Sequence, residues 1–339
     1  MSITADTRAA ARATFPDWVF APNIGGHPDI YEIENRALDP GGHVLAAMRR
    51  LAPWDGRTLV DLGCGAGFWL AGYARDAARV IGIEPDPALR ARAAARTRGL
   101  TAVEVMPGSA EHLPLADRSV DVVHARFAYF LAPGRRDAGG RRGTGGGDAG
   151  LTEVLRVLAP GGSLIIVDND YRWGQFAGLL AAGSKVAPQR TAGEVDAWWR
   201  ERGATRHEVR SQWSFASRAD LAAVLGIEVP AAVARSWLAR HPAATSLSCG
   251  YVLYCVGSLA SGRFDAPSSL VARSLVPRSP CSSVQAAPRP LARSPCSSVQ
   301  SAPRPLARSP VPSVYYPLPC PVGIGALDWL WVGQRRSAD

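Results

Sequence analysis

Three glycines at alternate positions mark the most informative segment of the chain, LVDLGCGAGFWL at residues 59–70. Asp61 closes an apolar strand there, and the expected helix begins after the glycines. The glycines are Gly63, Gly65 and Gly67. Glycine lets a backbone turn tightly and approach a ligand without a Cβ in the way, and a helix start offers free N–H groups. A dinucleotide fingerprint needs its third glycine where Phe68 stands, so the spacing argues against a dinucleotide and for another small ligand.

An acidic residue closes the next apolar run, RVIGIE at residues 79–84. Glu84 lies 17 residues after Gly67, and a carboxylate at a strand end can accept hydrogen bonds from both hydroxyls of a ribose. Farther along, GSAEHLPLADRSVDVV (108–123) places a loop before another strand. We expect Ala110 and Glu111 of that loop to lie over the edge of an adenine.

Together with LTEVLRVLAPGGSLIIVD (151–168), these blocks resemble the class I S-adenosylmethionine-dependent methyltransferases of the small-molecule type called methyltransferase type 11. The resemblance covers about residues 55–168. It implies S-adenosylmethionine as cofactor, with its methionine part at the glycine turn and its ribose at Glu84. The cofactor-binding residues that it implies are Tyr31, Asp61, Gly63, Gly65, Gly67, Glu84, Ala110, Glu111 and Ala125. Ser109 departs from the family, which often has Asp there, so the adenine N6 contact is expected to be weaker or absent.

The segment DWVFAPNIGGHPDIYEIENRA (17–37) resembles the tyrosine-bearing helix that related enzymes place over the cofactor. Tyr31 takes the tyrosine's position, and Arg36 could meet the cofactor carboxylate. The alternative interpretation is that this segment merely caps the sheet.

Methyl transfer is an in-line displacement at a sulfonium, so aligning the reactants and excluding water are the main requirements. A general base is needed only for a protonated, weakly acidic acceptor. The candidate catalytic residues are His27, in a Gly-Gly-His-Pro loop, and Arg126, just past the fourth strand, where ligands bind in such sheets. Asp168 and Asp170 could serve similarly at the fifth strand. No metal site is expected.

The remaining pattern predicts the elements that position these residues. Apolar runs at 58–63, 79–84, 101–106, 119–125 and 163–168 alternate with Ala- and Arg-rich helical segments. Such alternation predicts a doubly wound, mostly parallel α/β sheet covered on both faces. Further strand patterns at 207–215 and 246–257 bring the sheet to seven strands. The resulting organisation is a helical N-terminal cap (1–54), a Rossmann-like methyltransferase domain (55–257) and a C-terminal tail (258–339).

Two segments do not follow this rhythm. Residues 134–150 are rich in Gly and Arg, and we interpret them as a disordered, low-complexity insertion. In the tail, RSPCSSVQAAPRPLA (278–292) recurs as RSPCSSVQSAPRPLA (293–307) with a single difference. Repeats that stack need an apolar face, and this one is rich in proline, so we expect a disordered tail.

The net charge of +9 invites a nucleic-acid interpretation, but most of it resides in the insertion and the tail. The rest of the chain is nearly neutral, so nucleic-acid binding is not expected. The six cysteines do not form a disulfide framework, and no apolar run reaches membrane-spanning length. We therefore expect a cytoplasmic protein that does not enter the membrane. Its oligomeric state is left open.

The acceptor class is narrowed by two signatures that the sequence lacks. His124-Ala125-Arg126-Phe127 stands where base-amino methylases carry an Asn-Pro-Pro-Tyr type of signature, and the Pro-Cys pairs expected of a cytosine-C5 nucleophile occur only in the tail. We favour methyl transfer to an oxygen or nitrogen of a small molecule. The alternatives are a regulatory module that binds the cofactor without turnover, and an RNA-associated protein acting through the basic tail.

Overall fold

Short, largely apolar strands followed by amphipathic helices give this chain its alternating α/β order. The computed structural model describes residues 5–16, 18, 20–128, 146–183 and 192–257. In chain order, the elements are α1 (Ala5–Thr14), α2 (Pro22–Gly26), α3 (Pro28–Ala37), α4 (His43–Leu51), β1 (Thr58–Leu62), α5 (Leu70–Tyr73), β2 (Arg79–Ile83), α6 (Pro87–Arg96), β3 (Val103–Met106), β4 (Val120–Arg126), α7 (Gly146–Val157), β5 (Leu158–Asn169), α8 (Gln175–Gly183), α9 (Ala192–Glu201), β6 (Thr205–Ser214), α10 (Arg218–Glu228), α11 (Ala231–Arg240) and β7 (Ser246–Val256).

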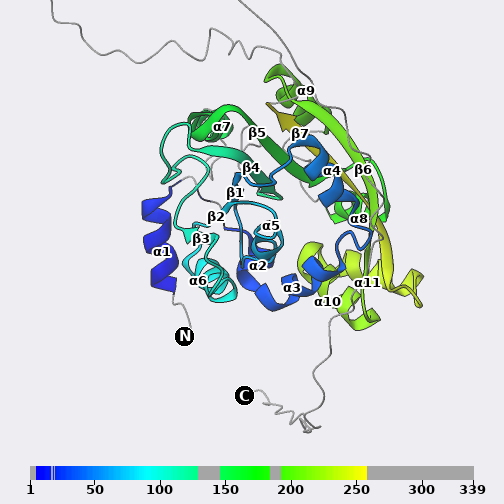
Figure 1. Cartoon of the computed structure of the whole chain (residues 1–339). Helices are drawn as coiled ribbons and strands as arrows, with labels where there is room; N and C mark the ends of the chain where they lie inside the picture. Colours follow the sequence, from blue (N-terminus) through cyan, green and yellow to red (C-terminus); the bar gives the residue numbers. More distant parts are fainter. Residues whose placement is uncertain (1–4, 17, 19, 129–145, 184–191, 258–339) are drawn as a thin grey trace, which may run out of the picture. The chain divides into compact units, whose positions relative to one another are not determined.

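Within the described ranges, the strands form one seven-stranded sheet in the order β3-β2-β1-β4-β5-β7-β6 (Figure 1). The β1–β2, β1–β4, β2–β3 and β4–β5 pairs are parallel, whereas β7 runs antiparallel to both of its neighbours. The predicted doubly wound, mostly parallel sheet is confirmed. The order reverses between β1 and β4, and the carboxyl ends of strands at such a switch point form a crevice for ligands.

Both faces of the central strands β1, β2, β4, β5 and β7 are largely buried, and alternate residues of these strands face opposite cores. In β1, Leu59 belongs to one core while Val60 and Leu62 belong to the other. Helices α3, α4, α5, α6, α8, α10 and α11 contribute to the first core, and α7 and α9 contribute to the second. This two-sided burial explains why the strands read as nearly continuous apolar runs.

Some boundaries differ from the prediction. The helix expected after the glycines is limited to α5, because the glycine turn extends through Trp69 before helical bonding begins. Two helices, α2 and α8, were not predicted. Residues 146–150, assigned to the insertion, instead begin α7, whose later turns are held in place by buried Leu151 and Val154. The predicted tail (258–339), and the rest of the insertion, lie outside the described residues.

The N-terminal helices contact elements near both edges of the sheet. Ion pairs link α3 to α6, through Asp29 with Arg92 and Glu32 with Arg96, each at 2.7 Å. On the other side α3 contacts α10, and an isolated bridge pairs Leu38 with β6. The predicted helical cap therefore spans from the β2–β3 side of the sheet to the β6–β7 side (Figure 1).

Candidate functional site

The glycine turn follows β1 at the switch point of the sheet. Gly63, Gly65 and Gly67 all have left-handed backbones, with φ of 74°, 56° and 76°, a conformation that costs other residues strain. The N–H groups of Gly63 and Cys64 donate to the carbonyl of Ile83 at 2.9 and 3.1 Å, so the end of β2 holds the turn. The sequence-predicted glycines thus form one preorganised loop.

Glu84 follows β2 and is joined to this loop. Its side chain is buried, with one carboxylate oxygen accepting from the Gly65 N–H and the other from the Asp86 N–H, both at 2.8 Å. Burial raises the pKa of Glu84 to about 7, against the lowering effect of these two backbone donors. Asp86 in turn caps α6 through the N–H groups of Ala88 and Leu89.

These residues fit the cofactor that the sequence implies. Each oxygen of Glu84 accepts one backbone hydrogen bond and keeps a further lone pair, which is the acceptor capacity that a ribose diol needs. A Cβ at Gly67 would lie 2.9 Å from the Cα of Ala93, so this glycine is required for the close approach of α6. A Cβ at Gly65 would lie 2.7 Å from Cδ1 of Ile24, so helix α2 rests against the same loop.

The loop after β3 carries Ser109, Ala110 and Glu111, the predicted adenine-side residues. Ser109 and His112 exchange backbone hydrogen bonds, each at 3.2 Å, and Ala110 is buried, while Glu111 is half-buried. The Ser109 hydroxyl is buried and has no hydrogen-bond partner among the described residues. The predicted residues therefore lie on one narrow turn beside Glu84, whose N–H bonds to the carbonyl of Met106 at the end of β3.

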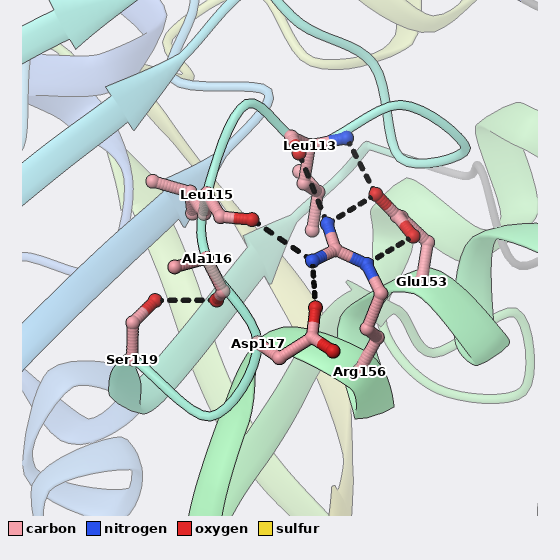
Figure 2. Close-up of polar contacts among 7 residues, drawn as sticks. All are labelled: Leu113, Leu115, Ala116, Asp117, Ser119, Glu153 and Arg156. Carbon is pink, nitrogen blue, oxygen red and sulfur yellow. Dashed lines mark hydrogen bonds and ion pairs between the residues drawn. The ribbon is translucent and has the colours of Figure 1, made fainter.

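Arg156 of α7 holds the rest of that loop (Figure 2). Its guanidinium donates to the carbonyls of Leu113 and Leu115 and pairs with Asp117 and Glu153. Glu153 also accepts from the N–H of Leu113 at 3.0 Å. The adenine-side loop is therefore fixed by α7, a connection that its sequence alone did not indicate.

Arg126, a predicted catalytic residue, is the last residue of β4 rather than a residue beyond it. Its guanidinium lies over the ring of Trp69, 4.0 Å from the centroid, and donates through Nη1 to the Tyr73 hydroxyl at 3.4 Å. The side chain is buried, although Nε and Nη2 have no partner among the described residues. The next residue, Phe127, has a left-handed backbone (φ 54°), a strained conformation that often accompanies functional sites.

Asp61 and Ala125 are also placed at this edge. Asp61 aligns with His124 of β4, and Ala125 aligns with Leu62. Both predicted residues are buried. Burial raises the pKa of Asp61 to about 7, with the nearby Arg126 guanidinium opposing the rise.

Tyr31 is brought to the same region by α3. Burial raises the pKa of its hydroxyl, the charges of Glu34 and Glu228 raise it further, and the charge of Arg126 lowers it. Tyr31 is thus within electrostatic reach of Arg126. The N-terminal helices are also attached beside Glu84, because Arg8 pairs with Asp86 at 3.1 Å.

The N-terminal segment also carries His27 and Arg36, for which the sequence suggested roles. His27, the candidate base, is exposed between α2 and α3, where its backbone carbonyl accepts from the Tyr31 N–H. Its role stays a prediction. The suggestion that Arg36 meets the cofactor carboxylate also stays a prediction, since Arg36 is exposed here and pairs with Glu32 on its own helix. Helical periodicity turns position 36 away from the face that carries Tyr31.

Sequence reasoning missed a carboxyl pair formed by buried Glu34 of α3 and half-buried Glu228 of α10. The two carboxyl groups are in hydrogen-bonding contact, and Glu228 also accepts from Asn23 Nδ2 at 2.7 Å. Burial raises the pKa of Glu34, and so does the negative charge of Glu228. Acidic residues so far apart along the chain carry no spacing signal; only the buried position of Glu34 on an amphipathic helix could have drawn attention to it.

His124 belongs to the core. Its ring is fully buried between the rings of Trp54 and Tyr73, at 5.0 and 5.1 Å, and burial lowers its pKa to about 3. Among the residues that the structure describes, no group of three His, Cys, Asp or Glu side chains could hold a metal ion. In the same ranges, no helix has both the length and the hydropathy needed to cross a membrane.

The chain is similar to known methyltransferases over its central part. Residues 60–166 match the family described as "Methyltransferase domain". The ubiquinone/menaquinone biosynthesis C-methyltransferase UbiE of Rubrivivax gelatinosus is 34% identical over 141 residues, 41% of this chain and 51% of that protein. The demethylmenaquinone methyltransferase of Thermobifida fusca is 27% identical over 206 residues, 55% of this chain and 82% of the relative. The matched segment thus spans about half the length of the first of these relatives.

A solved structure gives a weaker likeness. The SAM-dependent methyltransferase of Aquifex aeolicus is 18% identical, covers 67% of this chain and 97% of its own, and superposes with a TM-score of 0.40. The family match spans β1 to β5 and includes the glycine turn, Glu84 and Arg126. Residues 60–166 are thus similar to the methyltransferase domain family, and this match supports a class I S-adenosylmethionine-dependent methyltransferase with S-adenosylmethionine as its cofactor.

Proposed function

We propose that this protein transfers a methyl group from S-adenosylmethionine to an oxygen or nitrogen atom of a small molecule. The observation that carries the proposal is the bond from the Gly65 N–H to Glu84, which joins the glycine turn to the ribose-binding position at 2.8 Å. That connection sets the two halves of a cofactor cradle before any ligand arrives.

Each residue has a proposed role at this cradle. Asp61 and the glycine turn would hold the methionine part, Glu84 the ribose, and Ala110 with Glu111 the adenine. Tyr31 and Ala125 would complete the cofactor contacts. When bound, S-adenosylmethionine supplies a sulfonium-activated methyl group, so the protein's contribution is alignment and exclusion of water.

The acceptor is proposed to bind at the end of β4, beside Arg126. This position lies at the switch point of the sheet, next to the glycine turn on which Ile24 of α2 rests, and the charge of Arg126 reaches Tyr31 of α3. His27 remains a candidate for receiving a proton from the acceptor, and the Glu34–Glu228 pair is the buried alternative near Tyr31. A titratable group within the crevice is better shielded from water than exposed His27.

A carbon acceptor is the second candidate. The names of two relatives specify ubiquinone/menaquinone C-methylation and demethylmenaquinone methylation. An acceptor screen should therefore include demethylated quinols beside phenols, carboxylic acids and amines.

Calorimetry with S-adenosylhomocysteine tests the cofactor assignment first. We expect the wild-type protein to bind and Glu84→Ala to lose most of the affinity. Lack of binding by the wild type, or equal binding by Glu84→Ala, would contradict the assignment. A screen with radiolabelled S-adenosylmethionine then tests turnover, and binding without turnover across all acceptor classes would favour the regulatory module.

A further inference from the structure

One buried cation near the proposed acceptor site is only partly satisfied. Arg126 is 8% exposed, yet two of its three guanidinium nitrogens, Nε and Nη2, have no hydrogen-bond partner among the described residues. The third nitrogen, Nη1, donates to the Tyr73 hydroxyl at 3.4 Å. Buried polar groups without partners are rare, and a buried unpaired charge is strongly unfavourable.

The two free nitrogens lie on the same edge of the guanidinium. The Nε–H bond and one Nη2–H bond point in nearly parallel directions, which makes a fork with two donors. Carboxylates accept such a fork through both oxygens, and this bidentate arrangement is among the strongest side-chain hydrogen bonds. The free edge of Arg126 therefore has the donor geometry of a carboxylate-binding group.

The surroundings keep this edge in place. The guanidinium lies over the Trp69 ring, with Cζ 4.0 Å from the ring centroid. The hydrogen bond from Nη1 to the Tyr73 hydroxyl restrains rotation of the guanidinium within its own plane. Asp61 is near enough for its pKa to be lowered by Arg126, but no described carboxylate forms an ion pair with the guanidinium. The fork is thus held rigidly, and the described part of the protein does not fill it.

We propose that the free edge of Arg126, formed by Nε and Nη2, binds the carboxylate of a small molecule held in the crevice. The inference rests on the proposed function, because that function places the cofactor and the acceptor at the end of β4. Two sources share this chemistry, namely the amino-acid carboxylate of the cofactor and a carboxylate on the acceptor.

Benzoate is a suitable probe, because its ring suits a site walled by Trp69 and Tyr73 and its carboxylate suits the fork. Benzamide is the matched neutral control. The protein is saturated either with 5′-methylthioadenosine, which lacks the amino-acid part of the cofactor, or with S-adenosylhomocysteine, which retains it. Binding of benzoate and benzamide to each complex is followed by ligand-observed nuclear magnetic resonance.

We expect benzoate to bind the methylthioadenosine complex at least tenfold more tightly than benzamide. If S-adenosylhomocysteine abolishes that binding, the cofactor carboxylate fills the fork; if benzoate binds both complexes, the fork serves the acceptor. Equal binding of benzoate and benzamide, or binding of neither to the methylthioadenosine complex, would overturn the proposal. These wild-type measurements do not depend on any variant's folding.

Arg126→Lys adds a second readout, since it keeps the charge and removes the fork. We expect it to lose the benzoate preference at least tenfold, whereas Arg79→Lys at the exposed start of β2 should retain it. An unchanged preference in Arg126→Lys would overturn the role of the fork. If the wild type binds neither nucleoside, the proposed function fails, and the benzoate comparison on the free protein then tests the carboxylate site separately.

Discussion

The carboxyl ends of β2 and β4 each hold a buried charged side chain, and the two side chains differ in whether their polar atoms are hydrogen-bonded. Glu84, after β2, has a backbone N–H on each carboxylate oxygen, whereas Arg126, at the end of β4, has two nitrogens without a described partner. The first site is completed by folding, and the second requires something that the described chain does not supply. Under the proposed function, the cofactor would meet a rigid cradle at Glu84, and an incoming group would fill the open edge of Arg126.

The largest effect should come from the completed site. Replacing Glu84 by Gln keeps its size but removes the charged acceptor, so affinity for S-adenosylhomocysteine should fall about 10- to 100-fold, or about 1.5–3 kcal/mol. Calorimetry measures this change, with exposed Glu104→Gln on β3 as the control. An unchanged dissociation constant in Glu84→Gln would remove the basis for calling this end of the sheet the cofactor cradle.

A second prediction concerns the contact between α2 and the glycine turn. Gly65→Ala should lower the free energy of unfolding by about 1–3 kcal/mol, because it combines left-handed strain with a clash against Ile24. Gly56→Ala is the matched control, since Gly56 is also left-handed (φ 67°) but has open space around its Cβ direction. Equal losses in chemical denaturation would mean that α2 does not rest on the turn in solution.

The third prediction tests how far the rigid cradle extends. Arg156→Lys keeps the charge but cannot reach Leu113, Leu115 and both carboxylates at once. Because the side chain is one-third exposed, we expect a loss of about 1 kcal/mol in unfolding free energy and a severalfold loss of nucleoside affinity. Exposed Arg98→Lys should change neither quantity, and wild-type affinity in Arg156→Lys would show that the loop needs no support from α7.

The smallest expected effect is a pH dependence of the free energy of unfolding, caused by Glu34 of α3. The pKa of Glu34 is raised above its ordinary value near 4.5, so folding retains a proton that the unfolded chain releases. Stability is therefore lost as pH rises from about 4.5 toward the pKa of the folded state, by about 1.4 kcal/mol per pH unit within that interval.

Glu34→Gln removes this titration. Relative to the wild type, the variant should gain stability progressively as pH rises from 5 toward the folded-state pKa of Glu34 in denaturant titrations, because it has no proton to release. Glu104→Gln provides the exposed comparison. A difference that stays constant over this range would mean that Glu34 ionises normally in the folded protein.

The sequence predicts the Glu84 site more fully than the Arg126 site, because only the first is formed by neighbouring elements of the chain. The glycine turn and Glu84 lie within one β-α-β unit, so their spacing along the chain is also their geometry. Arg126 was placed at the right edge because parallel strands end together, but its stacking on Trp69 depends on how α5 packs. The Glu34–Glu228 pair joins helices from opposite ends of the described chain, and no local pattern encodes that contact.

The sequence by itself determined the alternation of strands and helices, the cofactor turn and the acid after β2, because each depends on local backbone preference or on periodicity. Only the tertiary structure decided which charged groups remain open. It turned Arg36 toward solvent, brought Tyr31 toward Arg126, and left one edge of that guanidinium free among the described residues. Pairing of buried charges depends on contacts between distant elements, so it becomes visible only after the helices have packed onto the sheet.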